Sequence, residues 1–271
     1  LPFTKVSALD LANRDKYIND IKQKLIAKLP DDFLKPPPLL GDLVKAGGLC
    51  MMIVPIDLQA PKGRLILPQV QAIRDVLDSD AMTLVVKERE YAAALQMLKQ
   101  SPDLVICDSQ VVQKMIADTP SNVKATTFSI LFSRNKGDIV EESRGAAFID
   151  HLRPGDKVLI AEACSHHPAQ DDIGRVKLPR WLRQYLGFEP EIDVAAGRDF
   201  PDNLEEYKLI FHCGSCMLTR NEKLVRIMKA KSAGVPITNY GIAISKVQGV
   251  LARALSPFPA ALEAYLEIAE E

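Results

Sequence analysis

The feature that most constrains the fold of this chain is a regular alternation between short, unbroken apolar runs and segments with helical periodicity. Residues 49–54 and 104–107, for example, contain no polar side chain. Unbroken apolar runs are typical of strands covered on both faces, and strand–helix–strand order is typical of parallel sheets with right-handed crossovers. The pattern therefore predicts an α/β fold.

The predicted elements follow one another along the whole chain. The predicted strands lie at 49–54, 83–86, 104–107, 126–132, 157–161, 191–194, 207–211 and 235–238. The predicted helices lie within 6–29 and at 68–77, 91–99, 111–117, 139–152, 181–186, 220–234, 242–254 and 258–270. The strands divide into two groups of about four, which indicates two sheets.

Two proline-containing segments interrupt this alternation. Pro36-Pro37-Pro38 predicts a stiff extended joint, and Arg153-Pro154-Gly155-Asp156 predicts a turn after which the pattern starts again. We therefore expect an amino-terminal segment 1–35, a first domain 36–153 and a second domain 154–271. Each domain is expected to be a small, mostly parallel sheet flanked by helices.

Charge and hydropathy exclude several classes of partner. The chain has 34 basic and 35 acidic residues, so its formal charge of -1 provides no general attraction to nucleic acid or anionic lipid. No apolar run approaches the ~20 residues of a membrane-spanning helix. The first residue is Leu1 and no signal peptide follows, so we expect a processed chain or a fragment. The five cysteines then favour a reducing, cytoplasmic location.

Two clusters of metal-ligand residue types follow predicted strands. Residues 164–167 read Cys-Ser-His-His after the strand at 157–161, and residues 212–216 read His-Cys-Gly-Ser-Cys after the strand at 207–211. The carboxyl ends of parallel strands form a common crevice, so the intervening sequence need not separate the clusters in space. We expect both clusters to contribute to one metal site.

The second cluster is well placed for thiolates. Thr219 and Glu222 form a predicted capping box at the start of the next helix, and a helix amino terminus favours negative charge. Two residues separate Cys213 from Cys216, which lets both sulfurs reach one metal or one cluster. The expected cysteine ligands are Cys164, Cys213 and Cys216.

A fourth ligand is less defined by the sequence. The candidates are His166, His212, Asp171 and Asp172. Three cysteines and a histidine would form a zinc site, whereas three cysteines with a variable fourth position would equally hold an iron–sulfur cluster. The residue types alone leave both metals open.

The remaining cysteine chemistry has simpler interpretations. A thioredoxin-like dithiol of Cys213 and Cys216 would leave Cys164 and the histidines without a role. Cys50 and Cys107 lie inside predicted strands, and we expect them to pack in the core.

One short motif suggests a nucleotide site but lacks its necessary companion. Asn135-Lys136-Gly137-Asp138 matches N-K-x-D, the guanine-selecting motif of GTPases. No Gly-Lys pair occurs in the chain, so the phosphate loop that such enzymes require is absent. We interpret the motif as a turn into the helix at 139–152 and expect no GTP site in this chain.

Taken together, the motifs resemble one family. The C-x-H and H-C-x-x-C elements at 164–166 and 212–216 are the most specific, and supporting stretches lie at 60–69, 171–176 and 239–241. Val6-Ser7-Ala8-Leu9 resembles the last guanine-contacting loop of Era-like G domains. The chain resembles HydF, the GTPase of FeFe-hydrogenase maturation, without its G domain.

The resemblance implies a function and a set of partners. It implies a 4Fe-4S cluster on Cys164, Cys213 and Cys216, with an exchangeable fourth position, in a scaffold or carrier. The cargo would be a di-iron precursor, bound transiently, and the partners would be the hydrogenase apoprotein and two radical-SAM maturases. Residues 36–153 would form a homodimer, 154–271 would bind the cluster, and 1–35 would be a remnant of the G-domain end and a linker helix.

The resemblance also bears on catalysis. The full-length protein would bind GTP, whereas this chain is not expected to be catalytic. The alternative is an interaction module with a structural zinc site of three cysteines and one histidine.

Overall fold

The computed structural model describes residues 3–7, 9–27, 38–56, 64–163, 172–197 and 199–269. The chain forms two units, Leu1–Pro37 and Pro38–Glu271. The first unit contains a 3-10 turn, η1 (Leu11–Asn13), followed by helix α1 (Arg14–Ile26). The Asp10 side chain caps the turn by accepting a hydrogen bond from the Asn13 backbone at 3.3 Å. No residue of α1 is buried.

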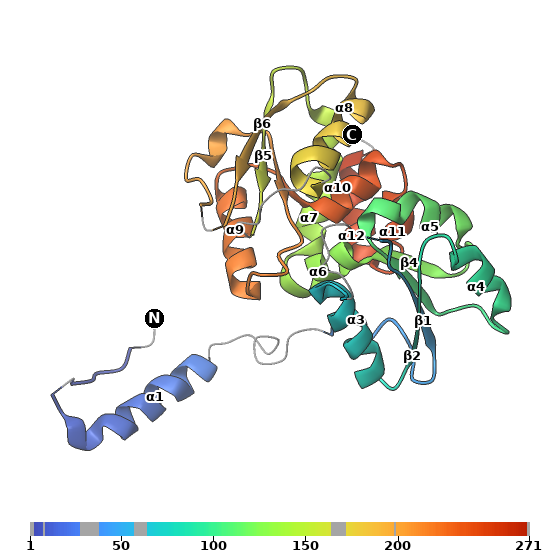
Figure 1. Ribbon diagram of the computed structural model, residues 1–271. Coiled ribbons are helices and arrows are strands. Elements are labelled where there is room, and N and C mark those ends of the chain that lie inside the picture. The colour runs from blue at the N-terminus through green and yellow to red at the C-terminus, as the bar shows by residue number, and fades with distance from the viewer. Residues whose placement is uncertain are drawn as a thin grey trace. The chain divides into compact units, whose positions relative to one another are not determined.

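The second unit contains two sheets of the same topology (Figure 1). The first sheet has the order β2-β1-β3-β4 and the second has the order β6-β5-β7-β8, with every neighbouring pair parallel. The first sheet's strands are β1 (Leu49–Ile53), β2 (Met82–Val86), β3 (Leu104–Cys107) and β4 (Lys124–Thr127). The second sheet's strands are β5 (Lys157–Ala161), β6 (Glu191–Ala195), β7 (Leu209–His212) and β8 (Ile237–Asn239). The predicted pair of four-stranded parallel sheets is confirmed.

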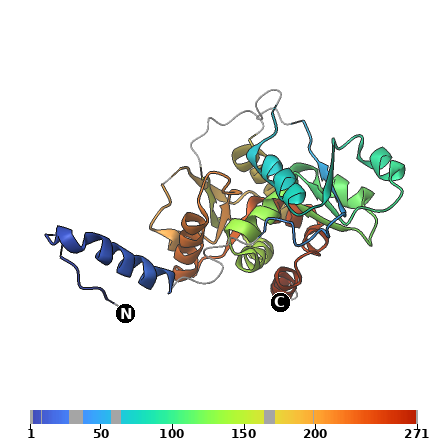
Figure 2. The same cartoon turned by 90° about the horizontal axis from the view of Figure 1, so that it is seen from below.

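Helices connect the strands and separate the two sheets (Figures 1 and 2). The α-helices that the structure describes in this unit are α3 (Leu67–Asp78), α4 (Tyr91–Met97), α5 (Val112–Asp118), α6 (Phe128–Lys136), α7 (Ile139–Ala147), α8 (Leu178–Leu186), α9 (Arg220–Ser232), α10 (Tyr240–Val247), α11 (Leu251–Ala254) and α12 (Pro259–Ala269). The 3-10 turns are η2 (Ser109–Val111), η3 (Phe148–His151) and η5 (Leu204–Glu206), and η4 (Ile173–Lys177) is a π-helical turn that leads into α8. Within the described ranges, no helix combines the length and apolarity that a membrane span requires.

One predicted strand is wrong over most of its length. The extended run expected at 126–132 ends at Thr127, and Phe128 begins helix α6. The Thr127 hydroxyl accepts a hydrogen bond from the Ile130 backbone N–H at 3.2 Å, which caps the helix. A β-branched and aromatic run is typical of a strand, but this cap and the burial of α6 override the preference.

Helix α9 begins as predicted. The Thr219 hydroxyl accepts from the Glu222 backbone N–H, and the Glu222 carboxylate accepts from the Thr219 backbone N–H at 2.9 Å. The reciprocal bonds satisfy two backbone donors that would otherwise be unpaired at the start of the helix. The capping box therefore fixes the point at which the segment after Cys216 becomes helical.

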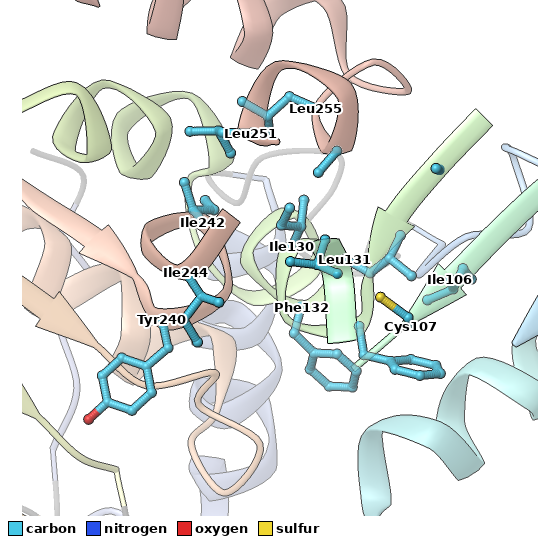
Figure 3. Packing of buried hydrophobic residues seen from close by; sticks show 14 of the residues in the cluster. Ile106, Cys107, Ile130, Leu131, Phe132, Tyr240, Ile242, Ile244, Leu251 and Leu255 are labelled. Atoms are coloured by element: carbon cyan, nitrogen blue, oxygen red, sulfur yellow. The ribbon is translucent and has the colours of Figure 1, made fainter. Parts of the chain in front are cut away.

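The larger of two hydrophobic clusters contains residues from both sheets and from the helices between them (Figure 3). It contains Ile106 of β3 and Leu131 of α6 together with Ile244 of α10 and Leu255 beyond α11. The second sheet contributes alternate residues to this core, such as Ile160, because successive strand side chains point to opposite faces. The opposite face of that sheet packs under α9 in a separate, smaller cluster.

Helix α7 lies close to the second sheet, although it precedes the turn at Arg153. A Cβ atom added to Gly145 would lie 2.0 Å from the carbonyl oxygen of Ile237 in β8. Only a glycine permits this approach between helix and strand. The domain limits expected from the sequence stay a prediction, and this contact shows that α7 packs on the second sheet.

Candidate functional site

The Cys213–Cys216 loop begins where β7 ends, beside the end of β5. Ala161 and His212 are register partners in the parallel ladder. The Cys213 N–H donates to the Ala161 carbonyl at 2.9 Å, and the Ala163 N–H donates to the Sγ atom of Cys213 at 3.1 Å. The two strand ends therefore meet, and Ala163 is the residue that precedes Cys164 in the sequence.

Cys213 lies in a largely desolvated position. Burial raises the pKa of its thiol, and the nearby Cys216 adds to this effect. The hydrogen bonds from the Ser215 and Ala163 backbones and the charge of Lys223 offset the rise only in part, so the thiol form is favoured in the metal-free chain.

Cys216 borders a cavity between the two domains. The cavity has a volume of about 230 Å³ and is mostly apolar, with Phe128 and Phe132 of α6 on one side and Gly214 and Tyr240 on the other. The loop reaches this position through Ser215, whose φ of 58° lies in the left-handed region. The turn separates the two cysteines, so that Cys213 lies against β5 while Cys216 lines the cavity.

Two hydroxyl groups at the cavity have no hydrogen-bond partner among the residues that the structure describes. They are the Oγ atom of Ser109 and the hydroxyl of Tyr240. Figure 3 shows the Tyr240 ring extending away from Phe132 and Cys107, with its hydroxyl at the far end. The Tyr240 hydroxyl lies beside η4, since a Cβ atom added to Gly174 would be 2.4 Å from it. Buried hydroxyls usually have partners, so both groups are exceptions.

Lys136 is a residue of the site that the sequence interpretation missed. Its Nζ atom donates to the carbonyl oxygens of Ser215, Cys216 and Leu218 at 3.2, 3.0 and 2.9 Å. Lys136 ends α6 in the first domain, so the segment interpreted as a simple turn contacts the cysteine loop. Desolvation lowers the pKa of Lys136, and the nearby Cys216 offsets this change only in part.

His212 is fully buried and hydrogen-bonded at both ring nitrogens. The Nη1 atom of Arg226 lies 3.2 Å from Nε2, and the Cys213 carbonyl lies 2.9 Å from Nδ1. Because a guanidinium only donates, Nε2 accepts and Nδ1 carries the proton that it donates to the carbonyl. Desolvation, followed by Lys223 and Arg226, lowers the pKa of His212 well below its usual value.

Asp172 is also buried and engaged. Its carboxylate accepts a hydrogen bond from the Arg175 backbone N–H at 2.7 Å and caps η4. The Arg175 guanidinium in turn binds the buried Glu162 carboxylate at 2.7 Å, just beyond β5. His212 would therefore have to give up one of its bonds before it could coordinate a metal, whereas the Asp172 carboxylate can keep its hydrogen bond and still act as a ligand.

The other expected ligands lie outside the described residues. These are Cys164, His166 and Asp171. Over the ranges that the structure does describe, no three histidine, cysteine or carboxylate side chains gather as a metal site. The assignment of the ligands stays a prediction.

The two remaining cysteines lie in the core strands. Cys50 of β1 and Cys107 of β3 are fully buried, and desolvation raises the pKa of both thiols. Their placement among the apolar residues of the first sheet agrees with the packing role expected for them.

Solved structures resemble this chain only weakly. Aspartate transcarbamoylase from Trypanosoma cruzi in complex with phosphate has 8% sequence identity and a TM-score of 0.26, covering 97% of this chain and 91% of that chain. A 5,10-methylenetetrahydrofolate dehydrogenase from the silkworm Bombyx mori has 10% identity and a TM-score of 0.24, covering 97% of each chain. Similarities at this level carry no argument about fold or function. Comparison with curated proteins gives no match.

Family models, in contrast, match most of the second unit. The hydrogen maturase F dimerization domain matches residues 39–137. The hydrogen maturase F tetramerization domain matches residues 139–257. The two matches adjoin at the turn between α6 and α7, and each contains one of the two sheets. The chain therefore belongs to the hydrogen maturase F family.

Proposed function

We propose that this chain is a scaffold or carrier in FeFe-hydrogenase maturation. Its family assignment supports a role in hydrogenase maturation. In the proposal, Cys164, Cys213 and Cys216 hold a 4Fe-4S cluster, and the chain passes a di-iron precursor to the hydrogenase apoprotein. The observation that carries the cluster assignment is the hydrogen bond from the Ala163 N–H to the Cys213 sulfur at 3.1 Å.

The donor chemistry of this strand end fits an iron–sulfur cluster. Thiolates are the usual ligands of such clusters, and hydrogen bonds to the sulfurs tune their reduction potentials. Cys213 already accepts a backbone hydrogen bond at its sulfur, and Cys216 lies at the wall of the interdomain cavity. When bound, a cluster with three thiolate ligands offers one iron position at which an incoming group can exchange.

The surrounding side chains have separate tasks in this proposal. Arg226 and the Cys213 carbonyl hold the His212 ring, which in turn supports the base of the loop. Asp172 and Glu162 order the segment that starts at η4 through Arg175. Since both ring nitrogens of His212 are engaged, His166, Asp171 and Asp172 are the stronger candidates for the fourth position.

Self-association is part of the proposed role. The matched models are those of a dimerization and a tetramerization domain. We infer that the dimer forms through the first domain, where β2 is an edge strand with the exposed side chains Met82 and Val85. A bare edge strand offers unpaired backbone groups to a second copy.

The proposal extends to partners and location. The two radical-SAM maturases would supply the di-iron precursor, and the process would take place in the cytoplasm. GTP would bind only to a longer form of the protein that carries a G domain.

Metal analysis of the anaerobically reconstituted chain tests the cluster assignment. We expect about four iron atoms per chain and an EPR signal in the reduced state. Reconstitution with zinc alone is the matched control. Stoichiometric zinc that iron and sulfide cannot displace would contradict the proposal and favour the structural zinc site. In that case, zinc removal would unfold the second domain.

A further inference from the structure

We propose that Lys136, from the first domain, is a positioning residue for Cys216 in the second domain. The effect of Lys136 on a bound cluster rests on the proposed function. The contacts between Lys136 and the cysteine loop do not depend on a bound cluster. The Lys136 ammonium group binds three carbonyl oxygens of one short loop, those of Ser215, Cys216 and Leu218. Lys136 is also the second residue of the N-K-x-D sequence, Asn135-Lys136-Gly137-Asp138.

The geometry matches the donor capacity of a lysine. An ammonium group has three N–H donors, and three carbonyl oxygens lie 2.9 to 3.2 Å from the Lys136 Nζ atom. The same nitrogen lies 5.6 Å from the centroid of the Phe132 ring, which lines the cavity beside Cys216. A planar guanidinium cannot direct its donors at three oxygens that converge on one point.

The contact between the two domains is reciprocal. Arg220, the first residue of α9, donates to the Asn135 carbonyl at 2.7 Å, near the end of α6. Further along α9, Lys223 lies 2.5 Å from the Glu142 carboxylate of α7, and both side chains are buried. This ion pair fixes α9 on the helix that directly follows α6. The end of α6 is thus held on the second domain, which keeps Lys136 over the loop.

The two cysteines of the loop depend on different domains. Cys213 is held by its own domain, through bonds with Ala161 and Ala163. The Cys216 carbonyl oxygen instead accepts a hydrogen bond from Lys136 of the first domain. Removal of Lys136 should therefore free Cys216 while leaving Cys213 in place, and this difference provides an internal control.

Site-resolved alkylation of the metal-free chain tests the proposal. Iodoacetamide is the probe, and mass spectrometry follows Cys213 and Cys216 separately in Lys136→Met, Lys136→Arg and the unchanged chain. We expect Lys136→Met to raise the Cys216 rate by about fivefold or more, with the Cys213 rate changed by less than about twofold. Lys136→Arg should give an intermediate ratio, because it keeps the charge but not the three bonds.

Lys177→Met is the matched control. Lys177 also donates across the domain interface, to the Gln110 side chain at 3.1 Å, and this hydrogen bond does not involve residues 213–218. We expect the ratio of the Cys216 alkylation rate to the Cys213 alkylation rate in this variant to equal that of the unchanged chain. A ratio that is unaltered in both Lys136 variants would overturn the proposal, and so would an equal rise at both cysteines. If Lys136→Met does not fold, Lys136→Arg carries the same comparison.

A second measurement separates this proposal from the cluster assignment. In the reconstituted chain, loss of the Lys136 charge should shift the reduction potential to more negative values, while Lys136→Arg stays close to the unchanged chain. If the unchanged chain binds no iron, the cluster assignment fails, but the alkylation ratio still decides the role of Lys136.

Discussion

The backbone N–H of Ala163 donates a hydrogen bond to the sulfur of Cys213 at 3.1 Å, across a separation of 50 residues. The parallel pairing of β5 with β7 produces this contact, because it aligns Ala161 with His212. A cysteine that follows Ala163 is therefore attached to a chain segment already in contact with the C-x-x-C loop.

The buried ion pair between Glu142 and Lys223 should be costly to break on one side only. Their charged atoms lie 2.5 Å apart, and the side chains are 0% and 1% exposed. Lys223→Met leaves the Glu142 charge buried without its partner and should lower the free energy of unfolding by about 3–5 kcal/mol. Urea denaturation measures this change. The paired variant Glu142→Leu with Lys223→Met should recover much of the loss, and an equal or larger loss would contradict the account.

Two glycines that face Ser129 should respond differently to alanine. A Cβ atom on Gly241 would lie 2.4 Å from the Ser129 Cβ atom, whereas one on Gly214 would meet only the Ser129 Oγ atom at 3.7 Å. Gly241→Ala should therefore force the domains apart locally and cost about 1–3 kcal/mol. Gly214→Ala is the control and should be close to neutral. Thermal or urea unfolding compares them, and similar losses in both variants would show that the interface yields without strain.

The buried neutral ring of His212 should make stability fall in acid. Desolvation, Lys223 and Arg226 lower its pKa in the folded chain, so the unfolded chain binds more protons below about pH 6.5. The free energy of unfolding should then decrease with falling pH, by up to about 1.4 kcal/mol per unit from this group. Urea denaturation between about pH 7.5 and 5.5 should give a shallower dependence for His212→Gln. An identical slope in both proteins would count against this origin.

Charge on the β2 edge should weaken dimerization. Val85 is 40% exposed on this edge strand, and Val194 is 43% exposed on β6, the corresponding edge of the second sheet. Val85→Lys should shift the chain toward monomer in sedimentation velocity, because a lysine opposes strand pairing across the edge. Val194→Lys is the matched control and should leave the dimer intact. A dimer that tolerates Val85→Lys would place the contact elsewhere.

Much of the fold follows from local patterns. The unbroken apolar runs at β1 and β3 and the capping box of Thr219 are local signals, and the structure confirms the elements that they predict. The error at 126–132 has a local cause as well. Its β-branched and aromatic residues favour a strand, while the decisive feature is one side-chain cap from Thr127 and the burial of the helix that follows.

The site was harder to predict from the sequence, because its contacts join residues that are far apart along the chain. The position of Lys136 depends on how α6 packs against a loop 79 to 82 residues away. His212 has the residue type of a ligand, but Arg226 and the Cys213 carbonyl occupy its nitrogens. Such hydrogen bonds between distant residues can be seen only in the folded chain. The adjacency of the two strand ends, in contrast, could be predicted, because the carboxyl ends of parallel strands lie at one crevice.

The most direct test of the account is the iron content and reduced-state EPR signal of a cysteine series, reconstituted anaerobically in parallel. Alanine at Cys164, Cys213 or Cys216 should each remove the 4Fe-4S signal and most of about four iron atoms per chain. Alanine at the buried Cys50 or Cys107 should retain both, apart from a modest loss of stability from the small cavity. Retention of the full signal in any of the first three variants, or its loss in Cys50→Ala, would contradict the proposed ligand set.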